Sequence, residues 1–173
     1  MKPKAVSVVG MGDDGCRSGS SRAFDAIARA RVLVGGKRQL AFFPEFEGKR
    51  LTLAGPLAPV LSELQRLAEE ETVCVLASGD PLFFGIAARV IELLGAEHVD
   101  VVPAPSSVQW AFARAGLSWD DASVISVHGR PLAGVCAQLR VLDKAALLTD
   151  AEHSPARIAQ HLLDHGVSDF EAH

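Results

Sequence analysis

Short, continuous apolar runs recur along the chain, and between them apolar and polar residues follow one another with helical spacing. Runs of this kind, rich in valine and leucine, are typical of parallel strands that are buried on both faces of a sheet. They predict strands at Ala5–Val9, Arg31–Val34, Arg50–Leu53, Thr72–Leu76, Val99–Val102, Ser123–Val127 and Ala145–Leu148.

The segments between these runs have the pattern of amphipathic helices. In Leu57–Glu71, for example, Leu61, Leu64 and Leu67 fall on one face and the acidic residues lie elsewhere. A regular alternation of strands and helices predicts an α/β protein with mainly parallel sheets. The other predicted helices run from Ser18 or Ser20 to about Ala30, over Phe84–Leu94 and Ser107–Ala115, and from Ser154 and Pro155 to Gly166.

A polar stretch after Gly116 separates the first five predicted strands from the last two. We therefore expect two lobes, residues 1–116 and residues 117–173. Two strands are few for a stable sheet, and Val167–His173 has the pattern of an approach to a further strand. These features predict that the second lobe is incomplete and that the chain is a truncated version of a longer protein.

Composition narrows the class of protein. Of the 173 residues, 49% are hydrophobic and the net charge is −4, so neither nucleic acid nor a membrane is an expected partner. Three scattered cysteines without a C-x-x-C pair favour a reduced, cytosolic protein. His161 and His165 are four residues apart, but the sequence offers no evident third ligand, so we expect a solvated helix face and no metal.

The first strand ends in a G-x-G-x-x-G pattern over Gly10–Gly15, which also marks dinucleotide-binding loops. An NAD(P)-binding oxidoreductase is therefore one alternative. It is disfavoured because no acidic residue ends the second strand, where such proteins bind the ribose. Asp13 and Asp14 would also repel a pyrophosphate. Lys37 and Arg38 could serve a ribose phosphate instead.

Three further loops follow predicted strands, at the edge where α/β sheets bind ligands. In the first, Gly79 allows close approach and Asp80 can accept hydrogen bonds from a ligand, although Asp80 could equally cap a helix. The second, Pro103–Ser107, offers two hydroxyls at a helix start. In the third, His128 is a candidate acid or base, and Arg130 could bind a substrate carboxylate through two hydrogen bonds.

Together, four stretches in this order carry a family resemblance: Val34–Leu40, Leu76–Gly85, Ser106–Arg114 and Ser126–Arg130. They resemble the tetrapyrrole methylase family, which transfers methyl groups from S-adenosylmethionine. The nearest branch is the CbiE-type domain of the cobalamin pathway, which methylates precorrin-6Y and also forms the amino-terminal half of CobL. The resemblance implies a two-lobed α/β fold, a homodimer and methylation of a precorrin at ring carbon 5.

The resemblance also implies roles for particular residues. The cofactor contacts would be Ser78, Gly79, Asp80, Ser106, Ser107, Leu148 and Thr149. The glycine loop, with Gly12 and Asp13, would line the substrate side of the cleft rather than hold a pyrophosphate. A polyanionic precorrin needs cations, for which the candidates are Arg17, Lys37, Arg38 and Arg130, and His128 is the candidate general base.

The chain departs from the family pattern in two loops, at Asp13–Gly19 after the first strand and at Pro103–Pro105 after the fifth. Methylation at carbon 15 with decarboxylation would belong to a separate or fused domain that this chain lacks. Two alternatives remain beside the oxidoreductase. One is a methylase of another tetrapyrrole or ring position, and the other is a cofactor-binding lobe that docks to a partner without turnover.

Overall fold

A computed structural model describes residues 5–16 and 19–173 of the chain. The chain folds into two compact units, Met1–Ser106 and Ser107–His173, and each is described by itself. Both units contain parallel strands connected through helices, which confirms the predicted α/β class. The units divide ahead of helix α5 (Ser107–Ala115), whereas the sequence placed this helix in the first lobe, and the lobe boundary after residue 116 stays a prediction.

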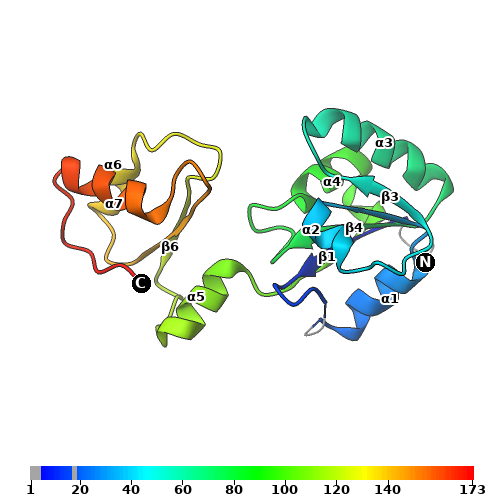
Figure 1. Cartoon of the computed structure of the whole chain (residues 1–173), viewed down its shortest axis with the longest axis horizontal. Coiled ribbons are helices and arrows are strands. Elements are labelled where there is room, and N and C mark those ends of the chain that lie inside the picture. The colour runs from blue at the N-terminus through cyan, green and yellow to red at the C-terminus, as the bar shows by residue number, and fades with distance from the viewer. Residues whose placement is uncertain (1–4, 17–18) are drawn as a thin grey trace. The chain divides into compact units, whose positions relative to one another are not determined.

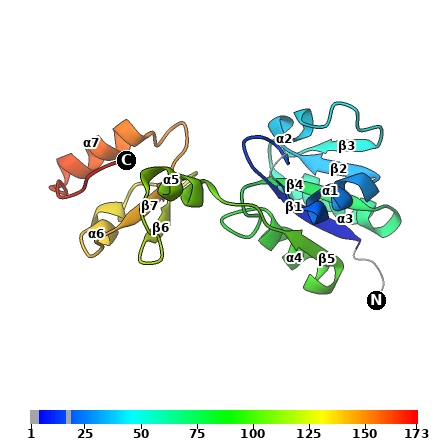
Figure 2. The same ribbon diagram turned by 90° about the horizontal axis from the view of Figure 1, so that it is seen from below.

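The first unit is built on a five-stranded parallel sheet with the strand order β3-β2-β4-β1-β5, which can be followed in Figure 2. Because all pairs are parallel, the carboxyl ends of the strands share one edge of the sheet. The strands are β1 (Val6–Met11), β2 (Val32–Gly35), β3 (Lys49–Thr52), β4 (Val73–Ser78) and β5 (Val99–Val102).

Helices cover both faces of this sheet, so successive strand residues enter two different cores. Val8 faces the core formed with α3 (Leu57–Glu70) and α4 (Ala87–Leu94), and its neighbour Val9 faces the opposite core. The second core is completed by α1 (Ser21–Arg29) and α2 (Lys37–Ala41). Figure 1 shows α3 and α1 on opposite sides of the sheet. Burial on both faces explains the continuous apolar runs of the sequence.

The second unit contains one parallel pair of strands, β6 (Ser123–Ser126) and β7 (Ala145–Leu148). Helix α6 (Val135–Leu139) and helix α7 (Pro155–Asp164) pack against this pair, and their core includes Cys136, Leu139 and Ile158. Ser154 caps α7 and accepts a hydrogen bond from the Arg157 backbone, as the sequence predicted.

All seven predicted strands are present, with ends that differ by no more than two residues. The helix predicted from Phe84 begins instead at Ala87. Helices α2 and α6 and the short 3₁₀ helix at Ala96–His98 were not predicted. Among the residues that the structure describes, none of the helices is both long and apolar enough to cross a bilayer.

Candidate functional site

Three loops meet at the carboxyl edge of the first unit's sheet with their backbones in contact. A Cβ atom on Gly10 would lie 2.2 Å from the Gly79 carbonyl oxygen and 2.7 Å from the Ala104 nitrogen. Gly79 has φ +60°, and a Cβ atom there would lie 3.1 Å from the Ser106 Cα atom. The Gly79 N–H donates to the Met11 carbonyl at 2.8 Å. Glycines therefore let the backbones at the ends of β1, β4 and β5 approach closely. This is the edge of a parallel sheet at which α/β proteins bind ligands.

Asp80 starts an irregular loop rather than a helix. Its Oδ1 accepts a hydrogen bond from the Leu82 N–H at 2.8 Å, a side-chain turn that fixes the carboxylate and leaves Oδ2 available to a ligand. Helix α4 begins only at Ala87, with Ile86 at its cap position, so Asp80 is not a helix cap. Phe84, inside the loop, has φ +53°, and backbone strain of this kind clusters at ligand sites.

Two serines flank this loop in the first unit. Ser78 is exposed at the end of β4, and its Oγ accepts a hydrogen bond from Gln39 Nε2 of α2 at 2.7 Å. Ser106 is 7% exposed and lies against Gly79. The structure therefore brings Ser78, Gly79, Asp80 and Ser106 to one edge, and Gln39 is a neighbour that the sequence did not suggest. Ser107 is exposed at the start of α5, in the second unit.

The glycine loop closes on itself. Gly12 N–H donates to the Gly15 carbonyl at 3.0 Å, and Gly15 N–H donates back to Gly12 at 3.3 Å. These two donors are then unavailable to a pyrophosphate, which the dinucleotide loop binds through its backbone N–H groups. Helix α1 begins later, at Ser21, and is capped by Ser20. Both features count against an oxidoreductase and agree with the prediction that this loop is not a pyrophosphate cradle.

The candidate substrate residues of the first unit lie at the same edge. Asp13, at the tip of the glycine loop, pairs with Arg38 of α2, with 2.6 Å between Oδ1 and the guanidinium nitrogen. Both side chains are largely exposed, so the pair is weak and a stronger anion can displace Asp13. Lys37 is exposed at the start of α2. Arg17, the remaining cation predicted in this unit, lies outside the described residues.

A second cluster lies at the carboxyl ends of β6 and β7. His128 Nδ1 is 3.3 Å from the Thr149 carbonyl oxygen. Asp150 accepts hydrogen bonds from the Gly129 N–H at 2.7 Å and the His153 N–H at 2.6 Å. These backbone donors lower the pKa of Asp150 to about 2. Thr149 therefore lies beside His128, while the Leu148 carbonyl accepts a hydrogen bond from the Val127 N–H at 2.9 Å.

Asp150 is a residue that the sequence did not single out. The sequence held a signal for it, because an acidic residue two positions after a predicted strand end is a candidate ligand at such a sheet edge. Its carboxylate connects the loop after β6 to the loop after β7, because one oxygen accepts a hydrogen bond from the Gly129 N–H and the other from the His153 N–H. The buried His153 ring also lies near it, with Nδ1 3.3 Å from Asp150 Oδ1. Asp150 therefore holds the residues of this cluster in place through its carboxylate.

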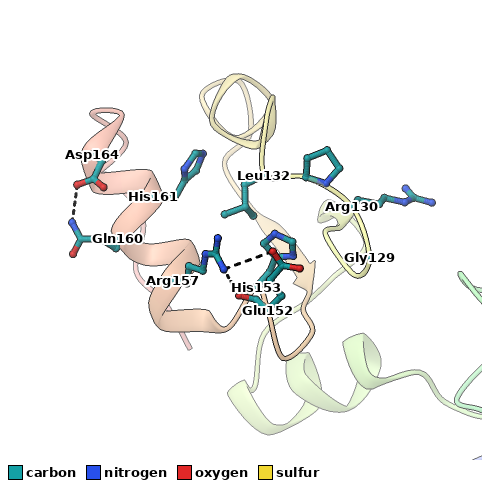
Figure 3. Close-up of a pocket in the computed structure, with 10 residues that line it drawn as sticks. Gly129, Arg130, Leu132, Glu152, His153, Arg157, Gln160, His161 and Asp164 are labelled. Carbon is teal, nitrogen blue, oxygen red and sulfur yellow. Dashed lines mark hydrogen bonds and ion pairs between the residues drawn. The ribbon is translucent and has the colours of Figure 1, made fainter.

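A cavity of about 730 Å³ lies between this cluster and α7. Its walls include His153, Arg157 and His161, with Leu132 on the opposite loop. Figure 3 shows that the Arg130 side chain extends from the loop away from α7, so Arg130 lies at the rim. The guanidinium of Arg157 is held by the Glu152 carbonyl oxygen at 3.2 Å.

Comparison with known proteins places the chain in a family. The model of the Tetrapyrrole (Corrin/Porphyrin) Methylases matches residues 5–172. The cobalt-precorrin-7 C(5)-methyltransferase of Salmonella typhimurium is 40% identical over 161 residues, which cover 93% of this chain and 79% of that protein. A decarboxylating precorrin-6Y C(5,15)-methyltransferase of a Sinorhizobium species is 35% identical, and the match covers 93% of this chain but 39% of that protein.

Solved structures agree with this assignment. The crystal structure of the cobalamin biosynthesis precorrin-6Y methylase (cbiE) from Archaeoglobus fulgidus matches with a TM-score of 0.68 and 25% identity. The match covers 88% of this chain and 77% of that one. The family resemblance of the sequence and the predicted fold class are both confirmed. The chain belongs to the tetrapyrrole methylases.

Proposed function

We propose that this protein transfers a methyl group from S-adenosylmethionine to carbon 5 of a precorrin ring in cobalamin biosynthesis. The observation that carries the proposal is the packing of Gly10, Gly79 and Ser106, which sets the Asp80 carboxylate at the ligand-binding edge of a parallel sheet. The names of the relatives from Salmonella and Archaeoglobus supply the reaction and the ring position.

The sulfonium of S-adenosylmethionine supplies an already activated methyl group, so the protein contributes mainly position and orientation. Asp80 Oδ2 would accept a hydrogen bond from a hydroxyl or amine of the bound molecule, while Oδ1 stays on Leu82. Ser78 and Ser106 flank this carboxylate, and Gly79 lets the ligand approach the backbone. Ser107, Leu148 and Thr149 are the proposed contacts from the second unit.

The acceptor carries acidic side chains and would be bound by exposed cations. Lys37 and Arg38 at the start of α2 are two of them, together with Gly12 and Asp13 of the facing loop. Arg38 would exchange its exposed partner Asp13 for a substrate carboxylate in a bidentate pair. Arg130, in the second unit, and Arg17 are the other two cations proposed to bind substrate carboxylates.

His128 is the proposed base for the ring proton. A carbonyl oxygen only accepts, so the contact with Thr149 fixes the proton on His128 Nδ1. The lone pair of the neutral ring then resides on Nε2, where it can accept a proton. Asp150 supports this orientation indirectly, because it holds the Gly129 backbone next to His128.

We propose that methylation at carbon 15 with decarboxylation belongs to another domain, fused or separate. The reason is that the match with this chain covers only 39% of the length of the decarboxylating Sinorhizobium protein. A homodimer and a cytoplasmic location are also proposals. Exposed apolar side chains that an interface could cover include Leu82 and Phe84 on the Asp80 loop.

Calorimetric titration with S-adenosylhomocysteine, with NADPH as a second ligand, tests the cofactor assignment. Asp80→Asn keeps an oxygen for Leu82 but removes the carboxylate, and loss of one hydrogen bond to a charged group costs about 1.5–3 kcal/mol. We expect binding to weaken roughly tenfold or more, with no change in Asp25→Asn, an exposed control on α1. NADPH binding without a homocysteine response would overturn the proposal.

The acceptor is tested by incubation with S-adenosylmethionine and either precorrin-6Y or the cobalt-containing precorrin-7. The expected product has gained one methyl group, located at carbon 5 by carbon-13 labelling of the cofactor. Arg38→Gln should raise the KM for the acceptor while S-adenosylhomocysteine still binds normally. A labelled methyl group at another ring position would instead identify a sibling methylase.

A further inference from the structure

A cysteine and two histidines come together in the second unit, next to the cavity described above, whose wall includes His161. Cys136 lies on α6, and His161 and His165 lie one turn apart on α7 and just beyond it. Their ligand atoms all lie within 4.8 Å of one another. Cys136 is buried, His161 is half-buried and His165 is exposed. The sequence showed only the histidine pair, because the third ligand comes from a different helix.

The two histidine rings lie close together, and His165 is oriented as a metal ligand would be. The two rings lie 4.2 Å apart between centroids. His165 Nδ1 is 2.8 Å from the His161 carbonyl oxygen, which can only accept, so Nδ1 carries the proton and Nε2 keeps its lone pair. Histidine ligands usually donate their second ring N–H to a carbonyl or carboxylate in this way.

The backbone around the cluster is also fixed. The Arg140 guanidinium, at the end of α6, donates a hydrogen bond to the His165 carbonyl oxygen at the end of α7. Cys136 and Leu139 of α6 share the core with Ile158 of α7. The two helices are therefore held together before any ion binds, so little chain entropy opposes its binding.

We propose that Cys136, His161 and His165 bind a zinc ion. Two imidazole nitrogens and one thiolate are the donors that zinc prefers, and bond lengths of about 2.0–2.3 Å place ligand atoms roughly 3.5 Å apart. The ligand atoms lie within 4.8 Å of one another, so they need to approach by at most about 1.3 Å to reach this spacing. The ion links α6, a helix of only five residues, to α7, and water or another ligand fills the fourth position.

The experiment uses the 173-residue chain without a tag, stripped with a chelator and titrated with zinc chloride by calorimetry. We expect one ion per chain, a Kd below about 1 μM, and release of the Cys136 thiol proton, visible as a dependence of the heat on the buffer. Cobalt(II) in place of zinc should give a sulfur-to-metal charge-transfer band, which reports the thiolate directly.

Two variants separate binding from folding. Cys136→Ser should abolish the charge-transfer band, and His165→Gln, at an exposed position, should weaken zinc binding at least tenfold without loss of the fold. His98→Gln, an exposed histidine of the first unit, is the matched control and should bind normally. Unchanged affinity in His165→Gln, a band that persists in Cys136→Ser, or no saturable binding would each overturn the proposal.

Discussion

Replacing Gly10 with alanine should disrupt the three-loop contact at the sheet edge more than any side-chain change there. The new Cβ atom would lie 2.2 Å from the Gly79 oxygen, and ordinary contacts begin at 3.4 Å, so the end of β4 must move by about 1 Å. The Ala104 nitrogen, at 2.7 Å, blocks the opposite direction. Overpacking against backbone costs about 2–3 kcal/mol, which lowers Tm by roughly 5–10 °C.

Calorimetric melting and titration with S-adenosylhomocysteine measure the two consequences together. Gly35→Ala is the milder control, since a Cβ atom there meets the Leu76 Cβ atom at 3.2 Å, a contact that a shift of a few tenths of an ångström relieves. The double variant Gly10→Ala, Ala104→Gly removes only the side-chain contact at 3.0 Å, so it should not restore binding. Wild-type melting and affinity in Gly10→Ala, or full rescue in the double variant, would refute the role given to the backbone contact.

Two more predictions concern titrating groups. The pKa of Asp150 lies near 2, below its usual 3.8, so its hydrogen bonds stabilise the second unit above pH 4 and that stabilisation is lost as the pH falls toward 2. The stability difference between wild type and Asp150→Asn in urea denaturation should therefore shrink over this range, and a constant difference would contradict the assignment. Burial raises the pKa of Cys74 to about 12, so a thiol reagent at pH 8 should leave Cys74 unlabelled until the chain is unfolded, as mass spectrometry of the labelled peptides would record.

The strands were predictable because each is a local pattern with a single physical cause. Burial on both faces requires a continuous apolar run, and Val73–Ser78 shows this requirement within six residues. The helix start at Phe84 was not predictable in the same way. The apolar spacing there is helical, but the Asp80 turn and the left-handed backbone of Phe84 postpone the helix to Ala87. Here a side-chain turn and one left-handed residue override the helical spacing of the apolar residues.

The loops of the candidate site could be predicted from the sequence, but the contacts between them could not. Ser78, Gly79 and Asp80 are adjacent in sequence, so one strand end identifies all three. The bond from Gln39 to Ser78 and the pair of Arg38 with Asp13 join residues that are far apart along the chain. Only the strand order, in which β4 inserts between β2 and β1, brings these loops together, and no local signal encodes it.

The glycine loop shows why the same G-x-G-x-x-G motif can serve different functions in different folds. In a dinucleotide fold the N–H groups of such a loop point at a phosphate, and the following helix begins at once. Here Gly12 and Gly15 satisfy each other, while Gly10 has a separate task, which is to admit the loops after β4 and β5. The proposed ligand-binding residue, Asp80, therefore lies after β4, the strand whose end packs against Gly10. Because Gly79 and Ala104 both lie close to Gly10, we expect a change at Gly10 to weaken binding at the proposed cofactor site without removing any proposed ligand contact, whereas a change at Asp13 should affect only the proposed substrate site.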